Sequence, residues 1–197
     1  MKQKLMSSIG GCLLLAFLLL VFPIRGQAAD SITVTDDDNG VKIQYELSKR
    51  GDSAGTYSAA ISFVDEDATP EELHIKSKVT DANGTYEIKN IESVAYKNSL
   101  KLVKIEEGIT SMAEGVWGKG YADSDTVTIS FPSTLEDVED GFLNWDKHPD
   151  SVIVPTWLSK MKPENGVVYA GKVAVYVPEA EKVSEITFKD GCTKIAH

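Results

Sequence analysis

A short apolar pattern recurs along this chain, and its spacing constrains the fold more than any single residue does. Residues 103–113 and residues 186–196 share it: apolar side chains fall at the same five places, a glycine precedes the third, and a threonine follows it. Ile105 and Ile129 are 24 residues apart, and Ile129 and Ile153 are again 24 residues apart. A repeat in the twenties with one short β-branched strand per unit predicts a solenoid, a class that binds partners along an extended surface.

The first 29 residues indicate a secretory signal peptide. Lys2 and Lys4 form a basic start, residues 13–22 form an apolar run, and residues 26–29 offer small side chains for cleavage. The run is shorter than the roughly 20 residues that a helix needs to cross a bilayer, so we expect removal rather than anchoring. The sequence therefore predicts a secreted, extracellular protein, with cell-surface association left open and no membrane insertion after cleavage.

The charge of the chain argues against a nucleic-acid partner. Without the three basic residues of the signal segment, 17 Lys and Arg face 30 Asp and Glu, a net charge of about −13. Such a surface repels a phosphate backbone. Cys192 is the only cysteine outside the signal segment, so we expect no internal disulfide. It takes an apolar place of the repeat, which favours a buried, unreactive thiol.

The residues after the signal segment predict a β-hairpin. Residues 32–35 and 41–47 alternate between apolar and polar on either side of Asn39-Gly40. Both central residues of a tight hairpin turn need positive φ, which Asn and Gly tolerate best. With a further strand at 57–64, this region is expected to cap the open end of the solenoid.

A calcium-binding loop is a weaker alternative for the same segment. Four of its residues fall at positions 3, 5, 6 and 12 of such a loop if Thr35 is the first: Asp37, Asn39, Gly40 and Glu46. The first position then lacks its carboxylate, and the alternation indicates strands rather than helices. The hairpin is therefore the preferred interpretation.

Later segments follow the repeat. Short strands are expected at 72–75, 100–105 and 127–129, and the Ile-x-x-Ile spacing of Ile88 and Ile91 returns 21 residues later as Ile109 and Met112. Residues 167–178 predict a second hairpin with Gly171 at its turn, leading into a final strand at Ile186. The predicted organisation is thus a signal peptide at 1–29, a hairpin cap at 30–67 and a solenoid of four to five units at 68–197.

The units resemble the BspA-type leucine-rich repeats of bacterial surface and secreted proteins. Residues 127–142 carry that pattern most fully, with apolar or corner residues at Ile129, Pro132, Leu135, Val138, Gly141 and Phe142. The resemblance covers roughly residues 68–197. It implies a mainly β, short, right-handed leucine-rich-repeat solenoid, and it associates the chain with bacterial adhesion to host proteins and to other bacteria. These repeats have no fixed binding residues, so the resemblance assigns none here.

Four aromatic residues are the candidate ligand-binding residues: Trp117, Tyr121, Trp145 and Trp157. Trp117 and Trp145 follow the corners of successive units, so both could lie on one exposed edge, where aromatics suit sugar stacking or protein anchoring. The competing interpretation is that these rings fill the core where the corner residues are small.

Other chemistry lacks a pattern in the sequence. The three histidines, at 74, 148 and 197, do not have the spacing of zinc ligands, and no nucleophile-elbow motif occurs. We therefore expect no catalytic residue, no metal and no cofactor. The leading hypothesis is a secreted, non-enzymatic, adhesin-like protein that binds an extracellular protein or glycan. The alternative is a structural or accessory module that assembles with a larger surface partner, or with itself as a homo-oligomer, through its C-terminal edge.

Overall fold

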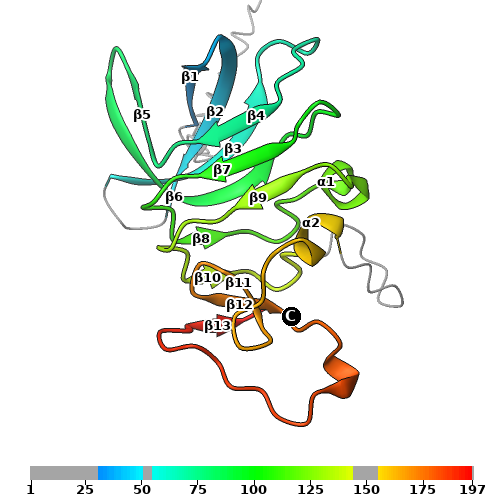
Figure 1. Cartoon of the computed structure of the whole chain (residues 1–197). Coiled ribbons are helices and arrows are strands. Elements are labelled where there is room, and N and C mark those ends of the chain that lie inside the picture. Colours follow the sequence, from blue (N-terminus) through cyan, green and yellow to red (C-terminus); the bar gives the residue numbers. More distant parts are fainter. Residues whose placement is uncertain (1–30, 51–54, 144–154, 197) are drawn as a thin grey trace, which may run out of the picture.

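The computed structural model describes residues 31–50, 55–143 and 155–196, and within these ranges the chain is mainly β, as predicted (Figure 1). The expected signal peptide, Trp145, His148 and Ile153 lie outside the described residues. No helix among the described residues is long and apolar enough to cross a bilayer.

The predicted N-terminal hairpin is confirmed. β1 (Ile32–Asp38) and β2 (Val41–Lys49) pair antiparallel around Asn39 and Gly40, which have φ of 55° and 86°. β3 (Thr56–Phe63) pairs antiparallel with β2. One face of these strands is buried because apolar residues alternate along them, as Ile43, Tyr45 and Leu47 do on β2.

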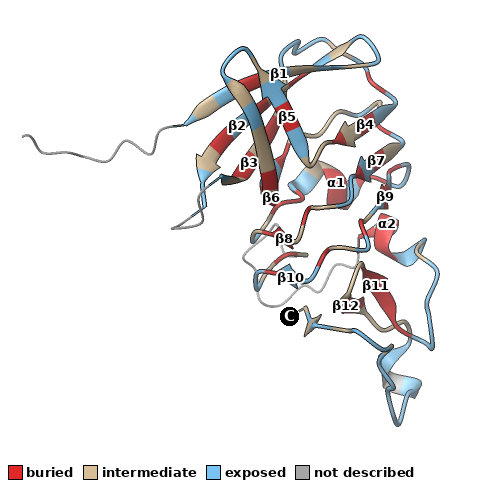
Figure 2. Ribbon diagram, turned by 90° about the vertical axis from the view of Figure 1, so that its left-hand side faces the viewer, coloured by how far each residue is buried: buried red, intermediate tan, exposed pale blue. Residues whose placement is uncertain are grey.

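Two ladders of parallel strands follow. The long ladder joins β3, β6 (Gly84–Val94), β8 (Ser111–Met112) and β10 (Asp137–Val138), and it forms one seven-stranded sheet with β1, β2 and β5 (Lys78–Asp81). The short ladder joins β4 (Glu72–Ile75), β7 (Leu102–Ile105) and β9 (Thr128–Ser130). The ladders lie side by side, and the buried faces of both contribute to a single apolar core (Figures 1 and 2).

The strand register agrees with one predicted spacing and corrects another. Ile91 pairs with Met112, which confirms the 21-residue relation along the long ladder. In the short ladder, however, Ile129 pairs with Val103, 26 residues earlier, so the alignment of Ile129 with Ile105 at 24 residues is wrong. A slip of two residues leaves every side chain on the same face of a strand, so the apolar pattern alone does not distinguish these registers.

The C-terminal region extends the long ladder. β11 (Val168–Ala170) and β12 (Val173–Tyr176) form the predicted hairpin, with Gly171 at its turn. The Lys172 amide donates a 2.7 Å hydrogen bond to the Leu135 carbonyl, which brings the hairpin against the unit that contains β10. A 3₁₀ turn (Ala180–Lys182) follows, and β13 (Lys194–Ile195) then pairs parallel with β12.

The predicted final strand at Ile186 is wrong. Residues 186–190 form no strand, and the last strand is β13. The matching residues of the earlier unit belong to β7, which has β4 on one side and β9 on the other. Among the described residues the short ladder ends at β9, so Ile186 has no ladder strand with which to pair.

Candidate functional site

Three of the four candidate aromatic residues lie in the core. Trp117, Tyr121 on α1 (Lys119–Asp123) and Trp157 on α2 (Thr156–Ser159) are at most 2% exposed. The Trp117 ring centroid lies 5.2 Å from that of Tyr121 and 6.1 Å from that of Trp157. The prediction of an exposed aromatic binding edge is therefore wrong for these three, because the two short helices pack together and bury the rings. Trp145 lies outside the described residues.

The opposite face of the seven-stranded sheet carries a polar groove of about 480 Å³. A row of polar side chains crosses five neighbouring strands there, since each residue is the register partner of the next: Ser48, Ser58, Asn90, Ser111 and Asp137. The row lies on the outer face because its neighbours along the strands, such as Ile91 and Met112, point into the core. The parallel register therefore builds one continuous polar floor from segments far apart in the sequence.

The floor of the groove is buried and hydrogen-bonded. Ser58, Asn90 and Ser111 are each less than 10% exposed. Asn90 Nδ2 donates to Ser58 Oγ at 3.1 Å, and Ser111 Oγ donates to Asn90 Oδ1 at 2.8 Å. Arg50 Nη1 donates to Ser111 Oγ at 2.8 Å. Buried polar groups that satisfy one another in this way hold a surface rigid, which lowers the entropic cost of binding a ligand on it.

The walls of the groove are rich in carboxylates. Glu92, Asp137 and Glu139 line it, against Lys49 and Arg50. Asp137 Oδ1 lies 2.9 Å from Lys194 Nζ, and this hydrogen bond raises the pKa of Lys194. Glu92 accepts a hydrogen bond from the Ser48 hydroxyl, and Glu139 accepts one from the Glu114 amide. Within the described residues Glu92 and Glu139 have no cationic partner, which leaves negative charge in the groove.

The groove continues as a shallower hollow of about 300 Å³ on the same face of the sheet. Glu46, Ala60 and Ser93 line it and are register partners across β2, β3 and β6. Small side chains on three adjacent strands leave room above the sheet. The groove and the hollow together suit an extended ligand better than a compact one.

The sequence contains a signal for this groove that was not used. In the units Ile88–Ile91, Ile109–Met112 and Leu135–Val138, the third residue is polar: Asn90, Ser111 and Asp137. Only the apolar positions of this motif served in predicting the core. In a ladder in register, the third positions must line up on the outer face.

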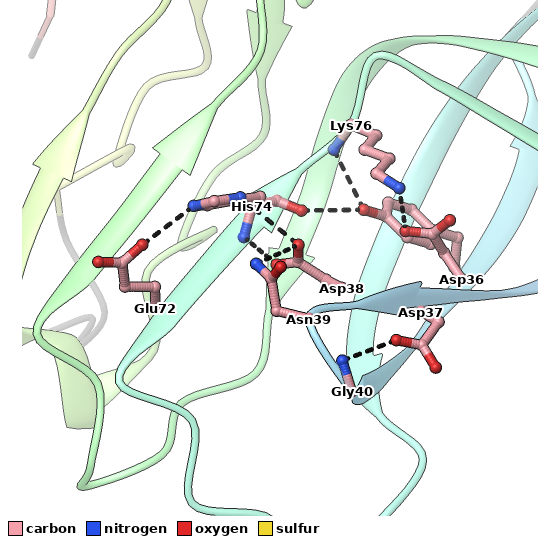
Figure 3. A network of polar contacts seen from close by, with 9 residues as sticks. Asp36, Asp37, Asp38, Asn39, Gly40, Glu72, His74 and Lys76 are labelled. Carbon is pink, nitrogen blue, oxygen red and sulfur yellow. Dashed lines mark hydrogen bonds and ion pairs between the residues drawn. The ribbon is translucent and has the colours of Figure 1, made fainter.

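A second polar network ties the N-terminal hairpin to the short ladder (Figure 3). Both carboxylate oxygens of Asp38 face His74: one accepts its backbone amide at 3.1 Å, and the other lies 3.5 Å from its ring nitrogen Nδ1. Lys76 Nζ lies 2.6 Å from Asp36, and this contact raises the lysine pKa. The side chain of Tyr45 completes the network, since its hydroxyl donates to the His74 carbonyl and accepts from the Lys76 amide. These contacts fasten β1 and β2 to β4.

The aspartates of the turn bind backbone rather than form a ring of ligands. Asp37 accepts a hydrogen bond from the Gly40 amide at 2.8 Å, the contact of a tight hairpin turn. Glu46, the last residue of the alternative calcium loop, instead lines the hollow described above. Across residues 31–50, 55–143 and 155–196, no group of three His, Cys, Asp or Glu side chains could hold a metal ion. Cys192 is half-buried rather than fully buried.

Two buried tyrosines predict a loss of stability at alkaline pH. Burial raises the pKa of Tyr45 and of Tyr121 well above the ordinary value of 10.0. Above pH 10 the unfolded chain therefore loses protons that the folded chain keeps. We expect each tyrosine to lower the free energy of unfolding by about 1.4 kcal/mol per pH unit above pH 10.

Urea unfolding between pH 8 and roughly pH 12 measures this slope. The double variant Tyr45→Phe/Tyr121→Phe has neither phenol, so its curve should be flatter by about 2.7 kcal/mol per unit above pH 10. Comparison of the two proteins at each pH removes the contribution of the lysines, which titrate in the same range in both. Equal slopes would contradict the burial of the two phenols.

Comparison of the chain with protein-family models, with curated proteins and with solved structures finds no match. The site is therefore interpreted from its own geometry.

Proposed function

We propose that this protein is a secreted, non-enzymatic binding protein whose polar groove takes an extended segment of an extracellular protein. The row from Ser48 to Asp137 across five strands carries the proposal. Its buried members already satisfy one another, so the floor stays in place without a ligand and the exposed wall groups are left to make contacts. Export is supported by the basic start, apolar run and small residues of the first 29 residues.

A short leucine-rich-repeat solenoid is the architecture that we propose for this role. In its favour, the short ladder pairs residues 30 and then 26 positions apart, and the long ladder pairs residues 21 and then 26 positions apart. Each unit thus supplies one short strand to each ladder, as stacked repeats do. Binding along a face that crosses several units is the usual mode of such arrays.

The charge of the walls favours a basic polypeptide over a glycan. Glu92 and Glu139 are the groove carboxylates without a cationic partner among the described residues, and a lysine or arginine side chain would pair with them. The described groove residues include no aromatic ring on which a sugar could stack. We therefore take a segment with lysine or arginine side chains as the ligand class, in an extended conformation that follows the row.

Fluorescence anisotropy with a labelled decalysine peptide tests this proposal, with decaglutamate as the comparison. We expect decalysine alone to bind. The variant Glu92→Gln/Glu139→Gln should bind it at least about tenfold more weakly, a loss of about 1.4 kcal/mol. The matched control is Glu66→Gln/Glu185→Gln, which makes the same charge change at exposed sites outside the groove.

The control separates recognition in the groove from general attraction to an acidic protein. Equal weakening in both double variants would overturn the groove as the site. Failure of decalysine to bind better than decaglutamate would overturn the basic ligand class. Binding of a neutral oligosaccharide that the groove variant abolishes would favour a glycan instead.

A further inference from the structure

The C-terminal segment, residues 183–196, is the most apolar part of the described surface. Among the described residues five large hydrophobic side chains are exposed, and four of them belong to this segment: Val183, Ile186, Phe188 and Ile195, each between 37% and 48% exposed. The fifth, Val64, lies elsewhere. Soluble proteins rarely gather exposed apolar side chains in one short segment unless something covers them.

The same pattern is buried where it occurs inside the ladders. Val103, Ile105 and Met112 hold the places in their unit that Ile186, Phe188 and Ile195 hold in the last unit. The first three are at most 4% exposed, because β7 and β8 each have ladder neighbours on both sides. β13 has only β12 as a neighbour, on one side. Within this chain, then, the structure that covers such a unit is another unit of the same pattern.

The edge of β13 is also poorly defended against pairing. Natural sheets guard an exposed edge with unpaired charges, and the lysine on this strand, Lys194, is already paired with Asp137. The segment carries Glu185 and Asp190 against Lys189 and Lys194, so its net charge is zero, whereas the whole chain has a net charge of −10. Two copies can therefore bring this segment together without the repulsion that the rest of the surface would cause.

We propose that residues 183–196 pair two copies of this chain about a two-fold axis, with β13 of one copy beside β13 of the other. A two-fold contact uses the same patch on both partners, and this patch has the pattern that its own repeats cover inside the fold. The interface closes after two copies, because each chain offers one such end. This surface is separate from the polar groove, so the inference goes beyond the proposed function.

Light scattering on residues 30–197, over about a hundredfold range of concentration, tests the proposal. We expect twice the mass of one chain at the upper end of the range. The variant Phe188→Asp/Ile195→Asp places two unpaired charges in the contact, so its dissociation constant should rise at least about a hundredfold. Val64→Asp is the matched control, since it adds a charge at an equally exposed apolar side chain outside the segment, and it should dimerise as the unmodified chain does.

Circular dichroism and thermal melting keep this test free of folding defects, because all three altered side chains are exposed and the monomers should keep the same spectrum. A monomer at every concentration overturns the proposal, and so does a dimer that Phe188→Asp/Ile195→Asp leaves intact. Dissociation by Val64→Asp would equally overturn it. Growth beyond two copies would mean a head-to-tail contact and would overturn the two-fold arrangement.

Discussion

Replacement of Trp117 by alanine is expected to lower the free energy of unfolding by about 3–5 kcal/mol. Trp117 is 2% exposed, and its ring contacts those of Tyr121, Phe131 and Trp157 edge-on. Its removal leaves a cavity at the junction of α1, α2 and the ladders, where the neighbouring rings are too rigid to collapse into the space. Urea unfolding followed by circular dichroism measures the loss.

Two further variants isolate the cause of that loss. The indole N–H of Trp117 meets no hydrogen-bond acceptor among the described residues, so Trp117→Phe loses volume but no hydrogen bond, and it should cost far less than the alanine variant. Val64→Ala removes an exposed apolar side chain and should change stability by less than about 0.5 kcal/mol. A Trp117→Ala variant as stable as Val64→Ala would mean that Trp117 is exposed, as a binding-edge residue must be.

Local patterns predicted much of the fold. The Asn39-Gly40 pair predicted the first hairpin because few other residue pairs adopt positive φ at low cost. Gly171 predicted the second hairpin on similar grounds. The Ile-x-x-Ile spacing predicted the pairing of Ile91 with Met112, because an apolar residue repeated at a constant interval must return to the same core. Each of these signals lies within a few residues of the structure that it specifies.

The errors came from contacts between distant segments. The places of Trp117 and Trp157 depend on two short helices that meet only in the folded chain, and nothing close to either residue in the sequence distinguishes a buried ring from an exposed one. The final strand was predicted from apolar residues that match an earlier unit. A strand also needs a neighbour with which to pair, and the pattern of one segment does not reveal whether that neighbour exists.

The polar groove was missed for a different reason. Its floor residues, Asn90 and Ser111, occupy spacer positions that look like ordinary solvent-facing residues when each unit is considered alone. Their alignment becomes visible only once the register joins the units. The candidate site is thus a property of the stacking, and the same stacking leaves apolar side chains uncovered where it stops at β13. Binding and self-association follow in this protein from one repeat, through its outer and its inner positions.

The second large effect is expected at Gly171, which joins the C-terminal hairpin to the ladder. Its φ is +58°, and a Cβ atom added there would lie 2.5 Å from the carbonyl oxygen of Pro132 and 2.8 Å from that of Leu135. Neither backbone oxygen can move without disturbing the hydrogen bond between Leu135 and Lys172. Gly171→Ala should therefore lower the free energy of unfolding by about 3–5 kcal/mol, through backbone strain and overpacking together.

Gly166→Ala is the matched control for this variant. Gly166 also has a positive φ, +82°, but no atom lies within 4 Å of its added Cβ, so only the strain remains, at about 1 kcal/mol. Urea unfolding of both variants separates close packing from backbone conformation. Because β12 carries β13, separation of the hairpin from the ladder in Gly171→Ala should also weaken dimerisation through residues 183–196, whereas Gly166→Ala should not. Equal losses of stability in the two variants would mean that the hairpin does not pack against Pro132 and Leu135, and that the ladder ends at β10.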